Sequence, residues 1–313
     1  MWSAIVLASV LGLAQDADGQ SGANAVTGRG FTFTSAERKQ IDKLAKDARA
    51  DGDVFVVKSQ SFLVSAPNSA KLAAEIGVFL DAFQTAFFAR LDVKPQVDIV
   101  PTIVIHATPA EFQRKCVNGE RSAFLWLAKD KGWPEFHVHM ALETPKLDSL
   151  TDLDVRPLQR GVARALLRRV AGRNSPPAWL EEGVASWFEG LDIRADYAAD
   201  RTARCRRSPY LHRVRTIADD PARAPSLAAL FAIKVEHWNT DGFTEQTQQR
   251  NALAEAFVDL LLGTDVAKSE RKAVFEALRR GVPLDKLQAK ELLALEGKWR
   301  DHMRELAEYF RIG

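Results

Sequence analysis

The sequence predicts an α+β fold, with a small mixed sheet and helices in the N-terminal half and an all-helical C-terminal half. Runs of β-branched residues and alternating segments occur before residue 150 and stop there. Beyond that point, segments with apolar residues at three- and four-residue spacing follow one another. A chain of 313 residues, 46% of them hydrophobic, is long enough to bury a sizeable core in one large domain or two coupled ones.

Residues 1–30 are expected to precede this fold. Residues 1–14 contain an apolar run, and Gly12 and Ala14 supply the small residues of a signal-peptide cleavage site, although no Lys or Arg comes before the run. A short hydrophobic helix is the alternative. Residues 15–30 have the small, polar composition of a disordered leader. We therefore expect an exported protein, periplasmic or extracellular. No later stretch contains eighteen consecutive apolar residues, so no membrane span is expected in the mature chain.

Residues 31–150 are expected to form an N-terminal α/β part. Segment 69–91 carries apolar residues at helical spacing and predicts a long amphipathic helix. Segment 135–142, EFHVHMAL, alternates and predicts an edge strand with His137 and His139 on one face. Similar signals predict a helix at 35–50, a hairpin at 53–66, a strand at 97–106 and a short helix at 110–115.

Residues 151–313 are expected to form a helical part. Segment 178–190 follows two prolines and has acids in its first turn, both of which are favourable at a helix N-terminus. Helical periodicity predicts helices at 156–172, 178–190, 226–235, 247–262, 267–280, 283–294 and 296–310.

Segment 177–188, PAWLEEGVASWF, resembles a helix of the gluzincin superfamily of zinc metallopeptidases, in its peptidase MA-like branch. In that family one helix carries His-Glu-x-x-His, and the next begins with Pro-x-Trp-Leu-x-Glu-Gly-x-Ala. The glutamate before the glycine is the third zinc ligand. The resemblance therefore implies a metallopeptidase-like helix pair and places Glu182 at the third-ligand position. It extends less specifically over residues 53–310.

The sequence departs from the family where the first motif should lie. With Glu182 aligned, the His-Glu-x-x-His positions fall on Arg160-Gly161-Val162-Ala163-Arg164. Arginine stays protonated and has no lone pair for a metal, and glycine has no side chain to act as a general base. We therefore expect no zinc cofactor and an inactive protein, a pseudoenzyme, with a binding or scaffold role.

Arginines recur every four residues on the first helix of the pair and form what we call the arginine stripe: Arg156, Arg160, Arg164 and Arg168. Arg160 and Arg164 border the apolar side of this helix. We expect one of them to pair with Glu182, which would put a charge bridge where zinc lies in the family. A solvated helix face is the alternative.

Two other functions remain open. His137, His139 and Glu182 could form a non-standard zinc site in an active hydrolase. Alternatively, the arginine stripe could bind an anionic polymer together with a second cluster, Arg201, Arg204, Arg206, Arg207, Arg213 and Arg215. The net charge of +2 favours no partner, and the binding role leaves peptide and polyanion as candidates. Whether Cys116 and Cys205 pair is also open.

Overall fold

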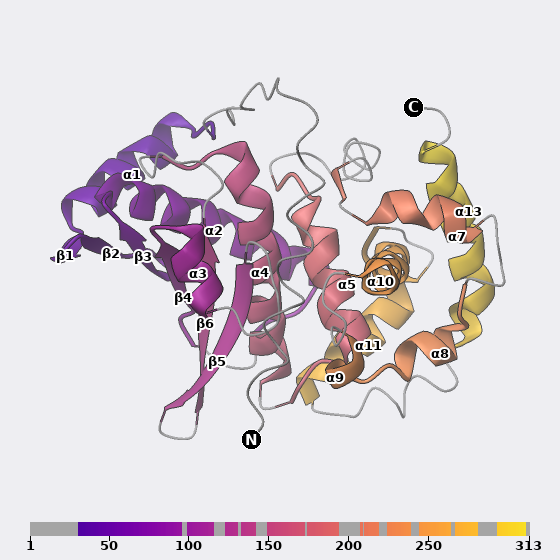
Figure 1. The fold of residues 1–313 in the computed structure, drawn as a ribbon. Helices are drawn as coiled ribbons and strands as arrows, with labels where there is room; N and C mark the ends of the chain where they lie inside the picture. The colour runs from indigo at the N-terminus through magenta and orange to yellow at the C-terminus, as the bar shows by residue number, and fades with distance from the viewer. Residues whose placement is uncertain are drawn as a thin grey trace, which may run out of the picture.

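The structure is a computed structural model. It describes residues 31–95, 99–115, 123–130, 133–141, 149–172, 174–193, 207–208, 210–218, 224–238, 244–263, 267–280 and 293–310. The β-sheet lies at one side of the molecule and the helices of the C-terminal half lie at the other (Figure 1). The architecture is α+β, and the prediction of the fold class is confirmed.

A six-stranded mixed sheet forms most of the N-terminal half. The strands lie in the order β1-β2-β3-β4-β6-β5. The three neighbours β3, β4 and β6 run parallel, while β1, β2 and β5 pair antiparallel. The bounds are β1 Arg49–Asp51, β2 Val54–Lys58, β3 Leu63–Pro67, β4 Thr102–His106, β5 Ala123–Asp130 and β6 Trp133–Ala141.

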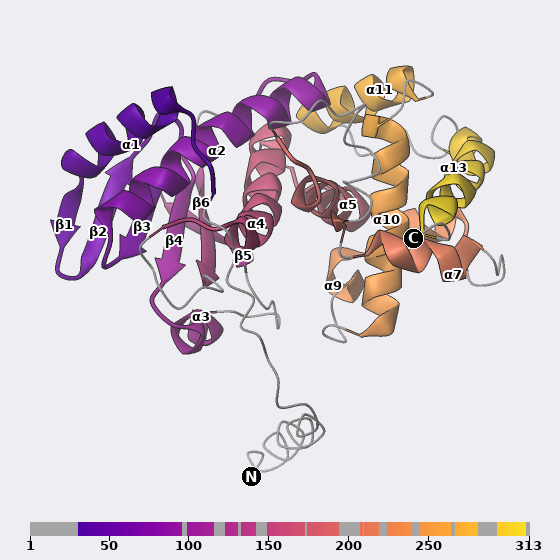
Figure 2. The same cartoon turned by 90° about the horizontal axis from the view of Figure 1, so that it is seen from above.

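Helices cover both faces of this sheet (Figure 2). Helices α1 (Ser35–Lys46) and α2 (Ala70–Leu91) lie on one face, which is the core face. By length and composition α2 could cross a membrane, but 61% of its apolar window is buried inside the protein, as in a core helix. The short α3 (Pro109–Lys115) lies against the other face, where Phe112 packs on Ala141.

The C-terminal half is built around a helix pair that follows the sheet. These two helices are α4 (Asp152–Ala171), which packs on β5 and β6, and α5 (Ala178–Glu189), which packs between α4 and α10. One continuous apolar core joins α2, the sheet and these helices, so it is not interrupted at residue 150. The remaining helices are α7 Val214–Ala218, α8 Leu227–Phe231, α9 Val235–Trp238, α10 Glu245–Gly263, α11 Lys268–Arg280 and α13 Glu296–Tyr309.

Several predicted boundaries are wrong. The first helix ends at Lys46, because residues 49–51 pair with β2 as strand β1. Helix α4 begins at Asp152 instead of residue 156, because Thr151 and Asp154 form a capping box there. The single helix expected at 226–235 is replaced by the two short helices α8 and α9. Within the described residues, the strand expected at 97–106 begins at Thr102.

Strand β5 is the largest feature that the sequence pattern misses. It pairs with β6 along its whole length and forms the edge of the sheet, so β6 is an internal strand and not the edge strand that we predicted. Some predictions lie outside the described residues: the signal peptide and leader at 1–30, the two cysteines, and most of the helix expected at 283–294.

Candidate functional site

The first helix of the pair, α4, places its arginines beside an apolar face. Thr151 accepts a hydrogen bond from the backbone N–H of Asp154, and the Asp154 carboxylate accepts one from the backbone N–H of Thr151. Behind this cap, Leu158, Val162 and Leu166 are fully buried at helical spacing. The neighbouring positions carry the arginine stripe, in which Arg160, Arg164 and Arg168 meet α5.

The second helix, α5, is buried over its whole length from Ala178 to Phe188. Gly183 explains how α10 comes so close to it. A Cβ atom at Gly183 would lie 2.7 Å from the Ala254 carbonyl oxygen and 2.7 Å from Cγ2 of Val258. A glycine is therefore needed at this position by packing alone.

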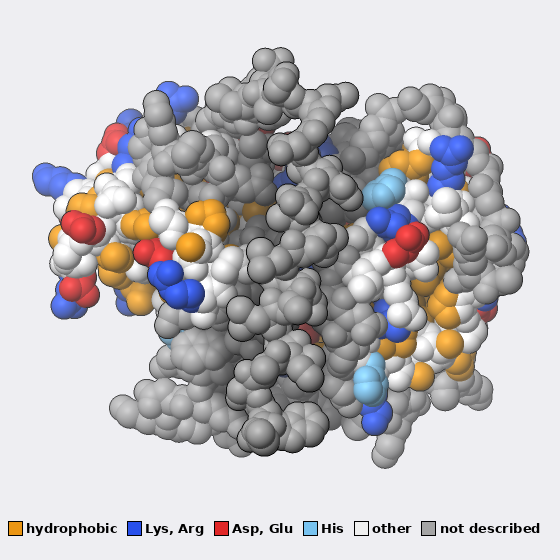
Figure 3. Space-filling view, in the orientation of Figure 1, with side chains coloured by type: hydrophobic (Ala, Val, Ile, Leu, Met, Phe, Trp, Pro, Cys, Tyr) orange, Lys and Arg blue, Asp and Glu red, His pale blue; other side chains and the backbone are white. Residues whose placement is uncertain are grey.

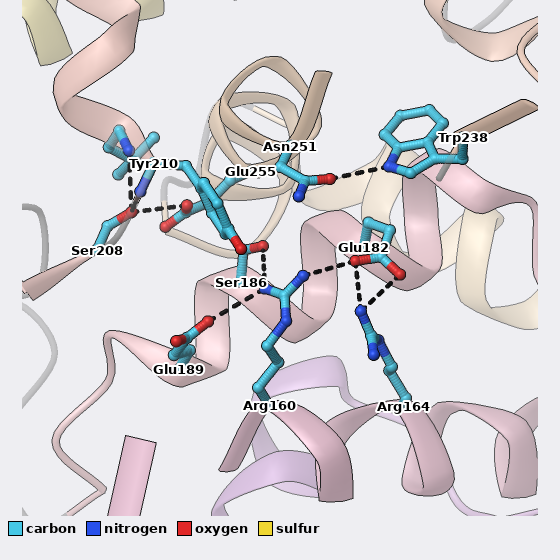
Figure 4. A network of polar contacts seen from close by, with 11 residues as sticks. Arg160, Arg164, Glu182, Ser186, Glu189, Ser208, Tyr210, Trp238, Asn251 and Glu255 are labelled. Atoms are coloured by element: carbon cyan, nitrogen blue, oxygen red, sulfur yellow. Dashed lines mark hydrogen bonds and ion pairs between the residues drawn. The ribbon is translucent and has the colours of Figure 1, made fainter. Parts of the chain in front are cut away.

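Arg160, Arg164 and Glu182 converge between the two helices, as the sequence predicts (Figure 4). Nη2 of Arg160 lies 2.6 Å from Oε2 of Glu182. Nη2 of Arg164 lies 2.8 Å from Oε1 and 2.6 Å from Oε2 of the same carboxylate. Their exposed fractions are 7%, 5% and 7%, so the ion pairs are buried and the alternative of a solvated helix face is wrong for Arg160 and Arg164.

Three further side chains complete what we call the α4–α5 charge network. Nη1 of Arg160 donates to Oγ of Ser186 at 2.8 Å and to Oε2 of Glu189 at 3.1 Å. Its guanidinium carbon lies 5.2 Å from the centre of the Tyr210 ring, in cation–π distance. With Arg160, Arg164, Glu182 and Glu189, the network holds two positive and two negative side chains and is formally balanced.

Sequence reasoning missed Ser186, Glu189 and Tyr210. A signal for the first two was present, because Glu182, Ser186 and Glu189 follow the four- and three-residue spacing of one helix face. Tyr210 arrives from a distant segment and had no local signal.

A neighbouring ion pair extends the polar contact between α4 and α5. Nε and Nη2 of Arg168 donate to the two carboxylate oxygens of Glu181 at 3.0 and 2.6 Å, in the fork geometry that arginine and carboxylate favour. The arginine stripe is thus paired with α5 at Arg160, Arg164 and Arg168, while Arg156 is exposed.

Burial and charge act in opposite directions on the acids of the network. Burial alone raises the pKa of Glu182, but the Arg164 and Arg160 guanidiniums more than reverse this and hold the pKa below its usual value. For Glu189 burial prevails over Arg160, and the pKa is raised. Burial also raises the pKa of Tyr210 to about 12, so its hydroxyl is neutral at physiological pH. Glu182 is therefore the firmly ionised acid of the network.

The residues at the position where the resemblance implies zinc do not fit that ion. Both oxygens of Glu182 accept hydrogen bonds from Arg164, and Oε2 also accepts one from Arg160. Neither guanidinium offers a lone pair, and Gly161 has no side chain. Over the part of the chain that is described, no group of three or more His, Cys, Asp or Glu side chains is placed to hold a metal ion.

The structure does not bring His137 and His139 to Glu182. The two histidines share one face of β6, as predicted, with ring centres 6.2 Å apart. The alternating residues Val138 and Met140 lie in the core that contains α4. The histidines therefore point to the opposite face of the sheet, which carries α3. The sequence could not reveal this, because it does not say which face of β6 meets the core.

Among the described arginines of the two clusters, Arg156 and Arg215 are exposed, and the others have partners within the protein. Arg160 and Arg164 are buried in the network. In the second cluster, Arg207 donates to the Gly190 carbonyl and Arg213 pairs with Glu245, while Arg201, Arg204 and Arg206 lie outside the described residues. On the face shown in Figure 3, positive and negative side chains are interspersed over the described surface.

A cavity of about 220 Å³ lies beside the network. Glu189 belongs to both, because it lines the cavity and pairs with Arg160. The wall carries acidic, basic and apolar side chains: Asp152, Glu189 and Asp192; Arg156 and Arg207; Phe31, Phe79, Val155, Leu191 and Ile193, with Gln159. Gln159 donates to the Leu191 carbonyl at 3.0 Å and so fixes the chain that leaves α5.

A second buried polar group connects α5 to the end of the chain. Nε1 of Trp187 donates to Oδ1 of Asp259 on α10 at 2.8 Å, and Nε2 of His302 on α13 lies 3.0 Å from Oδ2 of Asp259. Asp259 is fully buried and so depends on these partners. The three side chains join α5, α10 and α13.

No protein-family model matches this chain, and none of the curated protein sequences matches it.

Proposed function

We propose that this chain is an exported, catalytically inactive protein of the gluzincin metallopeptidase type, in which a buried arginine–glutamate network stands in the place of zinc. One observation carries the proposal. Glu182, at the third-ligand position of the family pattern, is bound by the two arginines that occupy the histidine positions. The correspondence with the family pattern is specific, because the two positions that would hold zinc with Glu182 instead carry arginines that both bind the Glu182 carboxylate.

The order of elements also supports this type of fold. The resemblance implies a hairpin, a long helix, a strand and then an edge strand before the helix pair. The hairpin β2–β3, α2 and β4 come in that order, while β6 is internal and β5 forms the edge. The proposal that the protein is exported rests only on the apolar run at residues 4–13. Mass spectrometry of the protein recovered outside the cytoplasm of an expression host should find that residues 1–14 have been removed.

Metal analysis and a rebuilt site together test the inactive helix pair. The wild-type chain should show no peptidase activity and no zinc that depends on Glu182. The triple variant Arg160→His/Gly161→Glu/Arg164→His should gain stoichiometric zinc, because the backbone of α4 and α5 already directs these positions at Glu182. Adding Glu182→Gln to the triple variant is the matched control and should remove that zinc.

Two results would contradict the proposal. One is zinc bound by the wild-type chain and released by Glu182→Gln, or a peptidase activity lost with it. The other is a folded triple variant that binds no zinc, which would show that the positions do not correspond to the family's metal site.

The binding role belongs to the cavity beside Glu189. Its wall presents three carboxylates and two guanidiniums around apolar side chains, which suits a peptide with both charges and apolar groups better than a uniformly anionic polymer. A panel of short peptides should raise the melting temperature of the wild-type chain, and Arg156→Ala should reduce the shift. Heparin should give no comparable shift, and stabilisation by heparin alone would favour the polyanion alternative.

A further inference from the structure

His106 and His139 form a side-chain pair that the α4–α5 charge network does not use. They lie on the adjacent parallel strands β4 and β6, where the register sets His139 opposite Val104 and His106 opposite Ala141. The two histidines are thus diagonal neighbours on the sheet face that carries α3. His139 is 8% exposed and His106 is half-buried.

The two imidazole rings of this pair lie at hydrogen-bond distance from each other. Nε2 of His106 lies 2.9 Å from Nδ1 of His139, and the two ring planes differ by only 19°. The ring centres are 5.2 Å apart, so the two nitrogens face each other along the line between the rings. One nitrogen must carry the proton of this hydrogen bond and the other must accept it. Transfer of that proton to the other nitrogen of its own ring leaves both imidazoles neutral, with two nitrogen lone pairs directed at the same small volume.

We propose that His106 and His139 form a two-histidine site for a divalent transition-metal ion of the copper(II) class. Two ligands at right angles around an ion lie about 2.9 Å apart when each is about 2.0–2.1 Å from the metal, the length of a zinc–histidine bond. The nitrogens of this pair are 2.9 Å apart. Ions with tetragonal nitrogen and oxygen coordination, Cu(II) and Ni(II), require ligands at right angles, and Cu(II) binds most tightly in the series.

Two aromatic side chains lie beside the histidine pair. His137 stacks on His139 with ring centres 6.2 Å apart, and Phe112 of α3 lies edge-on to His106 at 6.1 Å. To bind an ion at a right angle, both imidazoles turn away from the line that joins their nitrogens. This turn exchanges their mutual hydrogen bond for two bonds to the ion, and water supplies the remaining ligands. Two strands of one sheet carry the donors, so their separation is fixed by the strand register.

Titration of the full chain with Cu(II), followed by calorimetry and by electron paramagnetic resonance, tests this site. The wild-type chain should bind one equivalent with the spectral signature of two nitrogen donors from imidazole. His106→Ala and His139→Ala should each weaken binding by more than the roughly tenfold that loss of an outer-shell partner costs. His212→Ala, on the short helix Leu211–Arg213 in the C-terminal half, is the matched control and should bind as the wild type does.

Circular dichroism melting verifies that each variant is folded. Should His139→Ala unfold, His139→Gln keeps the size and polarity of the side chain and replaces it in the test. Equal copper affinity in the wild type and in folded variants at both positions would overturn the proposal. An equal loss in His212→Ala would also overturn it, because the binding would then not belong to this pair. Neither result depends on Glu182, so the proposed function is tested separately.

Discussion

Helix α5 is buried on two sides that use different chemistry. Towards α4 it presents Glu182, Ser186 and Glu189, and it meets arginines in a network of ion pairs. Towards α10 it presents Gly183, and the backbone of α10 comes so close that a side chain at this position would collide with it. The contact with α4 fixes the position of α5 because each buried charged group needs a partner. The contact with α10 fixes it because no space remains between the two helices.

The largest expected effect breaks the charged side. Glu182→Gln leaves the buried Arg160 and Arg164 without the carboxylate that they share, and it should lower the free energy of unfolding by about 3–5 kcal/mol. Urea unfolding followed by circular dichroism measures this.

Glu245→Gln is the control for that experiment. Glu245 also pairs with an arginine, at 3.5 Å, but its side chain is 75% exposed, and exposed pairs contribute only about 0–1 kcal/mol. If both variants lost the same small amount of stability, the network would not be the stabilising group described above.

A smaller effect is expected on the apolar side. Gly183→Ala places a methyl group against the Ala254 carbonyl and Val258, and overpacking of this kind costs about 1–3 kcal/mol. Gly297→Ala on α13 is the matched control. A Cβ atom there meets nothing within 4 Å, so the variant should be unchanged or more stable by up to about 1 kcal/mol. Thermal melting should show a lower melting temperature for Gly183→Ala and an unchanged or higher one for Gly297→Ala, and equal shifts would contradict the close approach of α10.

The smallest effect is a pH dependence that separates the two acids of the charged side. The pKa of Glu182 is lowered in the folded chain, so its contribution is present above the unfolded pKa and is lost as the pH falls through the folded pKa. The pKa of Glu189 is raised, so the folded chain holds its proton more tightly than the unfolded chain does. Its contribution is greatest at low pH and declines as the pH rises through the folded pKa.

Unfolding free energies measured from acid to neutral pH distinguish these signs. The wild type should lose stability through Glu182 as the pH falls, and Glu182→Gln should not show this loss. The wild type should lose stability through Glu189 as the pH rises, and Glu189→Gln should not show that loss. Curves parallel to that of the wild type for both variants would show that neither carboxylate changes its pKa on folding.

The two sides of α5 also differ in how far the sequence predicts them. A four-residue repeat places Arg160 and Arg164 on one side of a helix, and the resemblance implies that Glu182 faces them, so their pairing could be predicted. The need for Gly183 does not follow, because it depends on α10, more than sixty residues further along the chain. Periodicity identifies a buried face but not the helix that covers it.

The sheet shows the same limit. Hairpin β2–β3 and helix α2 are set by short-range patterns and are confirmed. Strand β6 lies inside the sheet because β5 pairs with it, and for this reason the predicted edge location of β6 is wrong. The packing of α4 on one face of β6 leaves His137 and His139 on the opposite face, and the alternative metal site failed on that long-range contact.

The contact from Trp187 through Asp259 to His302 has a consequence for synthesis of the protein. The buried carboxylate of Asp259 on α10 has one partner on α5 and another on α13, near the end of the chain. While the ribosome is still making the last helix, Asp259 lacks His302 and the far side of α10 lies open to water. The helix pair can form early, but the environment of α5 is completed only after residue 302 has left the exit tunnel, so the packing around α5 waits for a segment that is synthesised much later.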